Sequence, residues 1–174
     1  MRGMSHPDYV VDCIDVKCGD TVVVEDTTGS RATVRVYGIE SPDNDHPYGS
    51  AAAEATRRAT QGKRVEIYVR GTDRHGHVVA RVLAGRTRLG RSLVRKGYAW
   101  HNRQEAPGAQ TLARLQQKAR TAGRGLWAQD TPSPPGEDRT HNSPSRAISQ
   151  RLVRFMKSFV RTALILGPAL VLMG

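Results

Sequence analysis

Five short segments of this chain alternate apolar and polar residues, and this period of two constrains the fold more than any other feature. Glycine-containing turns separate several of them. In a β-strand, successive side chains point to opposite faces, so each segment has one apolar face for a core and one polar face. We therefore predict five strands, at residues 9–17, 21–26, 31–39, 64–70 and 77–83.

Three other segments have helical patterns. Residues 49–60 are rich in alanine, a short stretch beginning at Leu89 is stopped by Gly97, and residues 110–122 form the last helical pattern. Five short strands with a helix between the third and the fourth is the element order of a small OB-type barrel. The fold class that we expect is β-rich α+β: a five-stranded OB-type β-barrel with about three helices.

The positive charge of the chain is concentrated towards its end. The formal net charge is +11 over 174 residues, which suits nucleic acid or an anionic membrane surface as a partner. No acidic residue follows Asp138, whereas six basic residues do, so more than half of the excess lies there. We expect a flexible N-terminus at 1–8, the barrel domain at 9–129, a disordered Pro/Ser-rich linker at 130–145 and a C-terminal segment at 146–174.

The C-terminal segment, residues 146–174, has two open interpretations. It combines apolar residues at helical spacing with basic residues and ends in an apolar run of 13 residues that contains Pro168. This run is shorter than the ~20 residues that span a bilayer. It is either an amphipathic segment that lies on a membrane surface or a helix that packs on the barrel or on another subunit. The first residues lack the apolar region of a secretory signal, so we expect a cytoplasmic or membrane-associated protein.

Two predicted loops carry carboxylates that can meet at one site. A glycine turn carries Asp20, and the bend after the third predicted strand carries Glu40 and Asp43. Carboxylates from two loops can hold one hard cation. The period of two places Arg35 on the polar face of its strand, pointing towards the same site. Three acids and an arginine predict a site that processes phosphate, although Asp20 and Asp43 also suit ordinary turns.

Several short motifs follow one another in a characteristic order. They are Gly-Asp-Thr at 19–21, Val-Arg-Val-x-Gly-Ile-x-x-Pro at 34–42, Tyr48-Gly49, Asp73-Arg-His-Gly76, Leu93-Val-Arg-x-Gly97-x-Ala-Trp100 and Gly125-Leu-Trp127. Over roughly residues 9–128 the chain thereby resembles the staphylococcal nuclease-like (thermonuclease) family. The resemblance implies an OB-type fold and Ca²⁺-dependent hydrolysis of phosphodiester bonds in DNA or RNA, with low sequence specificity.

The resemblance also assigns the metal site and the base. Asp20 and Glu40 match the two carboxylates that bind the metal, and Ser41 matches the residue whose backbone carbonyl binds it. Asp43 matches the carboxylate proposed as the general base in this family. The cofactor that this donor set implies is Ca²⁺, a hard cation with oxygen ligands.

Arg35 and His77 match the two arginines that bind phosphate in the family. A neutral imidazole has one N–H donor and no fixed charge, so His77 does not reproduce the two-point contact of a guanidinium. We expect nearby arginines to supply contacts there, and aromatic rings close to the site to stack on a nucleotide. The nucleic-acid-binding residues that we expect are Tyr48, Arg74, His75 and Arg81.

The chain departs from the family pattern at other positions as well. Glu40 stands where the family has aspartate, Asp43 where it has glutamate, and Cys18 where a second aspartate is common. Each exchanged carboxylate moves its oxygens by about one methylene, and displacements near 1 Å cost ~10²-fold in rate. We therefore expect a nuclease of reduced activity. The alternative is a catalytically impaired OB-fold module that binds nucleic acid, and membrane tethering is compatible with either.

Overall fold

The computed structural model describes residues 6–128. The predicted linker at 130–145 and the predicted C-terminal segment at 146–174 lie outside these residues, as does most of the predicted flexible N-terminus. Within the described part, the structure has no helix of the length and apolar character needed to cross a membrane.

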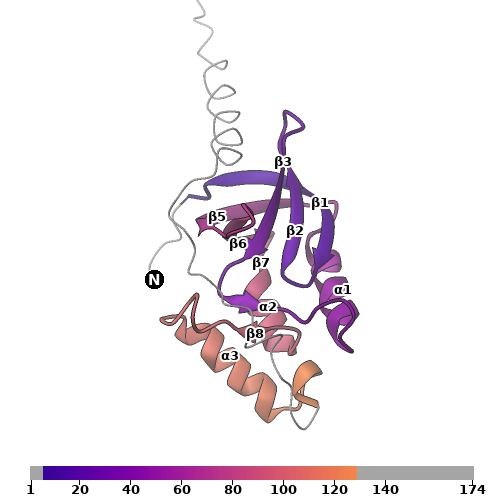
Figure 1. Cartoon of the computed structure of the whole chain (residues 1–174), viewed down its shortest axis with the longest axis vertical. Helices are drawn as coiled ribbons and strands as arrows, with labels where there is room; N and C mark the ends of the chain where they lie inside the picture. The colour runs from indigo at the N-terminus through magenta and orange to yellow at the C-terminus, as the bar shows by residue number, and fades with distance from the viewer. Residues whose placement is uncertain (1–5, 129–174) are drawn as a thin grey trace, which may run out of the picture.

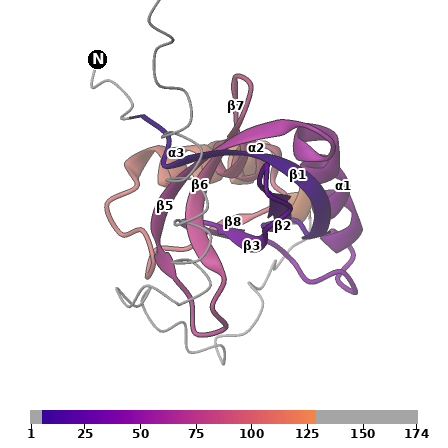
Figure 2. The same ribbon diagram turned by 90° about the horizontal axis from the view of Figure 1, so that it is seen from above.

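Five strands form a closed barrel, as the alternating pattern predicts. They are β1 (Tyr9–Cys18), β2 (Thr21–Glu25), β3 (Arg31–Val36), β5 (Arg64–Thr72) and β6 (Val78–Ala84). Their order is β3-β2-β1-β5-β6 with antiparallel neighbours, and a parallel pairing of β3 with β6 closes the ring. The strands encircle a common centre when the molecule is seen from above (Figure 2). The predicted five-stranded OB-type barrel is confirmed.

Three helices cover one end of the barrel. Their residue ranges lie close to the predicted ones. They are α1 (Gly49–Thr60), α2 (Leu89–Lys96) and α3 (Gln110–Thr121), followed by the 3₁₀ turn η1 (Gly125–Ala128). Helix α1 packs against β1, and α2 packs against both β6 and α3. Helix α2 therefore lies between the barrel and α3 (Figure 1). It ends at Gly97, whose φ of 75° is a left-handed conformation that glycine adopts without strain.

The predicted strand 31–39 is too long, because β3 ends at Val36 and a turn at Gly38 separates it from Ile39. Gly38 has a φ of 77°, and a Cβ there would lie 2.9 Å from the Cβ of Ala106. After this turn, β4 (Ile39–Glu40) leaves the barrel and pairs with β8 (Trp100–His101). A last short strand, β7 (Thr87–Arg88), pairs with β6 at its outer edge. The turn at Gly38 directs the chain towards the loop between β1 and β2.

The core consists mainly of β-branched residues on the inward faces of the strands. Val34 and Val36 of β3 are each 1% exposed, and Val22 and Val24 of the neighbouring strand are fully buried. Since inward and outward positions alternate along a strand, Arg35 lies on the outer face. The alternation that builds the core thus also turns this arginine away from it.

Candidate active site

The turn between β1 and β2 packs directly against the segment that follows β4. A Cβ on Gly19 would lie 2.7 Å from the Cβ atoms of both Ser41 and Ala52, so this close approach requires glycine. The Ser41 backbone N–H donates to Asp20 Oδ2 at 2.8 Å, and the Asp20 backbone N–H donates to Ser41 Oγ at 3.1 Å. The two loops that the sequence predicted to meet therefore do lie together.

The carboxylate of Asp20 accepts two further hydrogen bonds at its other oxygen. Oδ1 accepts from the hydroxyl of Thr21 at 2.8 Å and from the thiol of Cys18 at 3.3 Å. Burial, followed by the charge of Asp20, raises the pKa of Cys18 to about 11. Cys18 is therefore a protonated donor to this carboxylate near neutral pH, and it lacks the thiolate character of a nucleophile.

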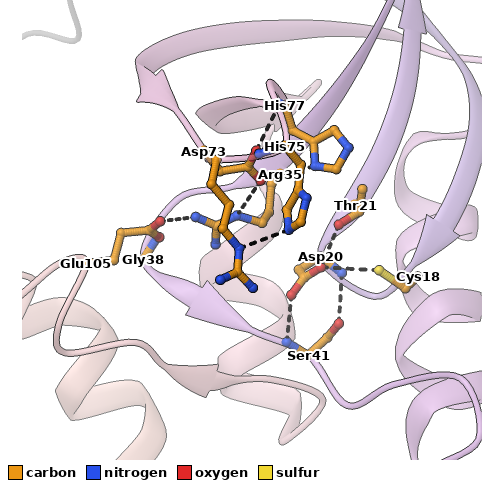
Figure 3. Close-up of polar contacts among 11 residues, drawn as sticks. Cys18, Asp20, Thr21, Arg35, Gly38, Ser41, Asp73, His75, His77 and Glu105 are labelled. Carbon is orange, nitrogen blue, oxygen red and sulfur yellow. Dashed lines mark hydrogen bonds and ion pairs between the residues drawn. The ribbon is translucent and has the colours of Figure 1, made fainter. Parts of the chain in front are cut away.

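Arg35 lies directly beside this turn. It is the cross-strand partner of Thr21 in the pairing of β2 with β3. The N–H of Val36 donates to the carbonyl oxygen of Asp20 at 2.8 Å. Paired residues on neighbouring strands project to the same face, so Arg35 and Thr21 emerge side by side. Figure 3 shows the resulting arrangement, with Arg35 between the Asp20 turn and the loop of Asp73.

Two carboxylates contact the guanidinium of Arg35. Glu105 Oε1 accepts a hydrogen bond from Nη2, and Asp73 Oδ2 lies 3.6 Å from Nε. The Glu105 side chain is only 4% exposed, and it also accepts from the N–H of Gly38. Glu105 is not among the site residues predicted from the sequence, because it lies in a loop without periodic pattern and reaches Arg35 only through the tertiary fold.

Asp73 connects Arg35 to His77. Its Oδ1 accepts from the backbone N–H groups of His75 and His77 at 2.9 Å each, and its Oδ2 lies 3.1 Å from His77 Nδ1. Burial raises the pKa of the Asp73 carboxyl, but the backbone N–H and the charge of His77, with the N–H of His75, outweigh it. The net effect lowers the pKa. Asp73 is thus held as an anion between the two predicted phosphate-binding residues.

The other predicted nucleic-acid contacts lie in three different places. His75 and Arg74 lie in the same loop as His77: Arg74 Nε donates to His75 Nε2 at 3.1 Å, and the rings of His75 and His77 are 5.8 Å apart. Tyr48 lies at the start of α1, with its ring 6.4 Å from that of His46. Arg81 is placed differently. Its guanidinium lies 5.8 Å from the centre of the ring of Tyr37, and its role in binding nucleic acid stays a prediction.

Glu40 and Asp43 occupy the segment that leads from β4 to α1. Both are partly buried. The segment folds back sharply, since a Cβ on Gly49 would lie 1.8 Å from the carbonyl oxygen of Asp43. Glycine at the start of α1 therefore fixes the backbone on which Asp43 is carried.

The residues present fit a hard cation that is only partly enclosed by protein. Within residues 6–128, no group of three or more His, Cys, Asp or Glu side chains is arranged to hold a metal ion. A carboxylate offers about four lone-pair directions, and the three hydrogen bonds to Asp20 leave one of them on Oδ2. The predicted ligands, Asp20, Glu40 and the carbonyl of Ser41, offer only oxygen donors. Such a set suits a cation that completes its shell with water and substrate oxygens.

Comparisons with known proteins agree on one family. A family model described as "Staphylococcal nuclease homologue" matches residues 33–129. An "Uncharacterized endonuclease" from Escherichia coli is 30% identical over 118 residues, covering 67% of this chain and 76% of the bacterial protein.

Plant proteins are similar as well. A "Probable staphylococcal-like nuclease CAN1" from Oryza sativa subsp. japonica is 31% identical over 113 residues, and a "Staphylococcal-like nuclease CAN1" from Arabidopsis thaliana is 30% identical over 113 residues. Each match covers 65% of this chain, but only 34% of the rice protein and 35% of the Arabidopsis protein. The chain thus spans about a third of the length of these plant relatives.

Proposed function

Because the chain belongs to the staphylococcal nuclease-like family, we propose that it is a nuclease, a hydrolase that cleaves phosphodiester bonds of DNA or RNA with low sequence specificity. The observation that carries the proposal is the position of Arg35 beside Asp20, fixed by the 2.8 Å hydrogen bond from the Val36 N–H to the Asp20 carbonyl. Phosphoryl transfer needs a positioned nucleophile and positive charge on the phosphate oxygens. The guanidinium supplies positive charge, and the carboxylate turn beside it can hold a cation that supplies more.

The proposed cofactor is Ca²⁺, held by Asp20, Glu40 and the backbone carbonyl of Ser41. When bound, a hard cation supplies positive charge to a phosphate oxygen. The contribution of Asp20 is to keep its carboxylate in one orientation, which the Ser41 N–H and the Thr21 hydroxyl enforce from opposite oxygens.

Asp43 is the proposed general base. Its carboxylate takes the proton of the attacking water, and the backbone that carries it packs against Gly49. Arg35 has five N–H donors. Glu105 accepts a hydrogen bond from Nη2, and Asp73 lies in an ion pair with Nε. The remaining donors are available to the non-bridging oxygens of the phosphate, where two parallel hydrogen bonds are strongest.

We also propose that the activity is low. His77 supplies an imidazole where the family has a guanidinium, and two carboxylates already offset the charge of Arg35. The same observation supports a second candidate function, that of an OB-fold module which binds nucleic acid without cleaving it. Membrane association through residues 146–174 is compatible with both, and binding of the chain to anionic liposomes with and without those residues tests it.

Digestion of single-stranded DNA by the full chain, with millimolar-range Ca²⁺ and with a chelator, tests the proposed function. We expect slow, calcium-dependent cleavage that is lost in Asp43→Asn. The control is Asp45→Asn, an exposed acid in the same segment. His77→Arg should raise the rate by ~10²-fold, the order expected when a misplaced contact is restored.

The two candidate functions give different results. If the wild-type chain and His77→Arg both bind the DNA but neither cleaves it with Ca²⁺, the nuclease proposal fails and the binding module stands. Cleavage that is unaffected by Asp43→Asn would remove Asp43 from its proposed role.

A further inference from the structure

A groove of about 760 Å³ runs alongside the candidate site. Its walls come from β5 and β6 on one side and from the beginnings of α2 and α3 on the other. None of the residues proposed above for the metal site or for the general base lines it. Four arginines and two tyrosines do: Tyr37, Tyr68, Arg70, Arg81, Arg88 and Arg91.

The arginines of the groove act on one another electrostatically. Burial lowers the pKa of Arg81, and the charges of Arg70, Arg91 and Arg88 lower it further. Burial and the charge of Arg88 likewise lower the pKa of Arg91. Among the described residues, no salt bridge is formed by Arg70, Arg81 or Arg91. Like charges gathered in one groove favour an anionic ligand.

The only carboxylate among the lining residues is that of Asp8, and it has a partner within the barrel. Its Oδ2 accepts the backbone N–H of Val69 at 2.8 Å. Among the described lining residues, one carboxylate therefore stands against four guanidinium groups. The net charge of the groove walls is strongly positive.

Two helix N-termini add to this charge. The first residues of α2 and of α3 both line the groove, and neither helix has a side-chain cap or an acidic residue in its first turn. The N-terminal end of a helix carries a partial positive charge and exposes backbone N–H groups. Phosphate groups bind readily at such ends, and here two of them converge with the arginines.

The groove is connected to the candidate site through Tyr37. The ring of Tyr37 lies beneath the guanidinium of Arg81, and its hydroxyl donates to the carbonyl oxygen of Glu105 at 3.0 Å. The carboxylate of Glu105 in turn binds Arg35. Tyr37 therefore links the groove at Arg81 to Glu105 and, through Glu105, to Arg35.

We propose that this groove binds the nucleic-acid strand on one side of the phosphate held at Arg35, with arginines on successive phosphates and the two tyrosine rings available to bases. This inference deepens the proposed function, because it rests on nucleic acid as the substrate class, but it does not require cleavage. A single strand is favoured because its bases are free to stack on aromatic side chains while its backbone follows a basic groove.

Binding of a labelled thymidine oligonucleotide of about 12 nucleotides, within the range that one OB-fold covers, tests the proposal. The full chain is used with a chelator, so that cleavage does not interfere, and affinity is measured by fluorescence anisotropy over a series of salt concentrations. The variant is Arg70→Gln/Arg91→Gln. We expect at least a tenfold loss of affinity, and a salt dependence whose slope falls by about 1.4, since each phosphate contact on a single strand contributes about 0.7.

The matched control is Arg95→Gln/Lys118→Gln, which removes the same charge from exposed positions outside the groove. Its slope should stay close to that of the wild type. Equal losses in both variants would overturn the proposal, because only net charge would then matter. So would displacement of the oligonucleotide by millimolar inorganic phosphate, since the groove would then be a site for a single anion.

The outcome is independent of the nuclease proposal. A chain that never cleaves DNA, but loses affinity only in Arg70→Gln/Arg91→Gln, supports the groove and contradicts the nuclease activity. A chain that cleaves DNA, but whose groove variant binds with wild-type affinity and slope, keeps the activity and contradicts the groove.

Discussion

Glu105 binds the guanidinium of Arg35 across a separation of 70 residues in the chain. The same carboxylate accepts the N–H of Gly38, so it fixes both the arginine on β3 and the turn that ends this strand. Its side chain is almost completely buried, at 4% exposure. Glu105 therefore helps to hold the candidate site in place. It also competes with phosphate for the guanidinium of Arg35.

Glu105→Gln should destabilise the protein and strengthen its affinity for phosphate. Loss of a buried, charged acceptor costs about 1–3 kcal/mol in the free energy of unfolding, and Arg35 loses an anion that neutralises it. The measurements are urea unfolding and the affinity for an oligonucleotide in the presence of a chelator. Glu54→Gln serves as the control, because Glu54 forms only exposed salt bridges on α1 and its loss should change stability much less. Unchanged stability of Glu105→Gln would contradict the supporting role.

Asp73 should make the stability of the protein dependent on acid pH. The pKa of its carboxyl in the folded state lies below the ordinary value of 3.8. A lowered pKa means that folding favours the ionised form, so this stabilisation is complete above pH 3.8 and is lost as the pH falls through the folded-state pKa. The difference in unfolding free energy between the wild type and Asp73→Asn should therefore shrink as the solution is acidified below about pH 5.

The contribution of the His77 ring to this effect is separable. His77→Gln keeps the backbone N–H that donates to Asp73 Oδ1, but removes the ring nitrogen at 3.1 Å from Oδ2. The dependence of its unfolding free energy on acid pH should lie between those of the wild type and Asp73→Asn. If the difference in unfolding free energy between the wild type and Asp73→Asn grows as the solution is acidified, the pKa of Asp73 is not lowered by folding.

The sequence predicted the parts of this molecule that depend on local pattern. Alternating residues predicted the five barrel strands because burial of one strand face is visible as a period of two. Gly38 was the exception. It continues an apolar run, and only the packing of Ala106 against it reveals why the chain turns there.

The candidate site and the groove show where local pattern ends. Asp20 and Ser41 were expected to meet because both lie in loops of recognisable motifs. Glu105 and three of the groove arginines were not expected at a site, since each is an ordinary polar residue in its own segment; these arginines are Arg70, Arg88 and Arg91. Arg81 was expected to bind nucleic acid, and the structure places it against Tyr37 in the groove. Such groupings arise from the closure of the barrel and the docking of α2 and α3.

Cys18 should react slowly with alkylating reagents. Its pKa of about 11, compared with an ordinary value of 9.0, reduces the thiolate fraction at pH 8 by about 100-fold, and the thiolate is the reactive form. Peptide mass spectrometry after treatment with iodoacetamide measures the rate for each cysteine separately, and the urea-unfolded chain gives the reference. Asp20→Asn should accelerate the reaction, because the charge of Asp20 is the second cause of the shift. A rate equal to that in the unfolded chain would contradict the raised pKa.

Cys18→Asp should strengthen calcium binding. The affinity of oxygen sites for Ca²⁺ rises with the number of charged ligands, and the described residues hold no cluster of three acidic, His or Cys side chains at this site. The thiol of Cys18 lies 3.3 Å from Asp20 Oδ1, so a carboxylate in its place would stand next to the proposed ligands. Thermal unfolding of the full chain over a calcium titration should show stabilisation at a roughly tenfold lower concentration than in the wild type. Without calcium, the variant should be less stable, because two neighbouring carboxylates repel each other. Cys18→Ser separates loss of the thiol from gain of charge: if it shifts the calcium midpoint as much as Cys18→Asp does, the added carboxylate is not a ligand, and the cation does not bind beside Asp20.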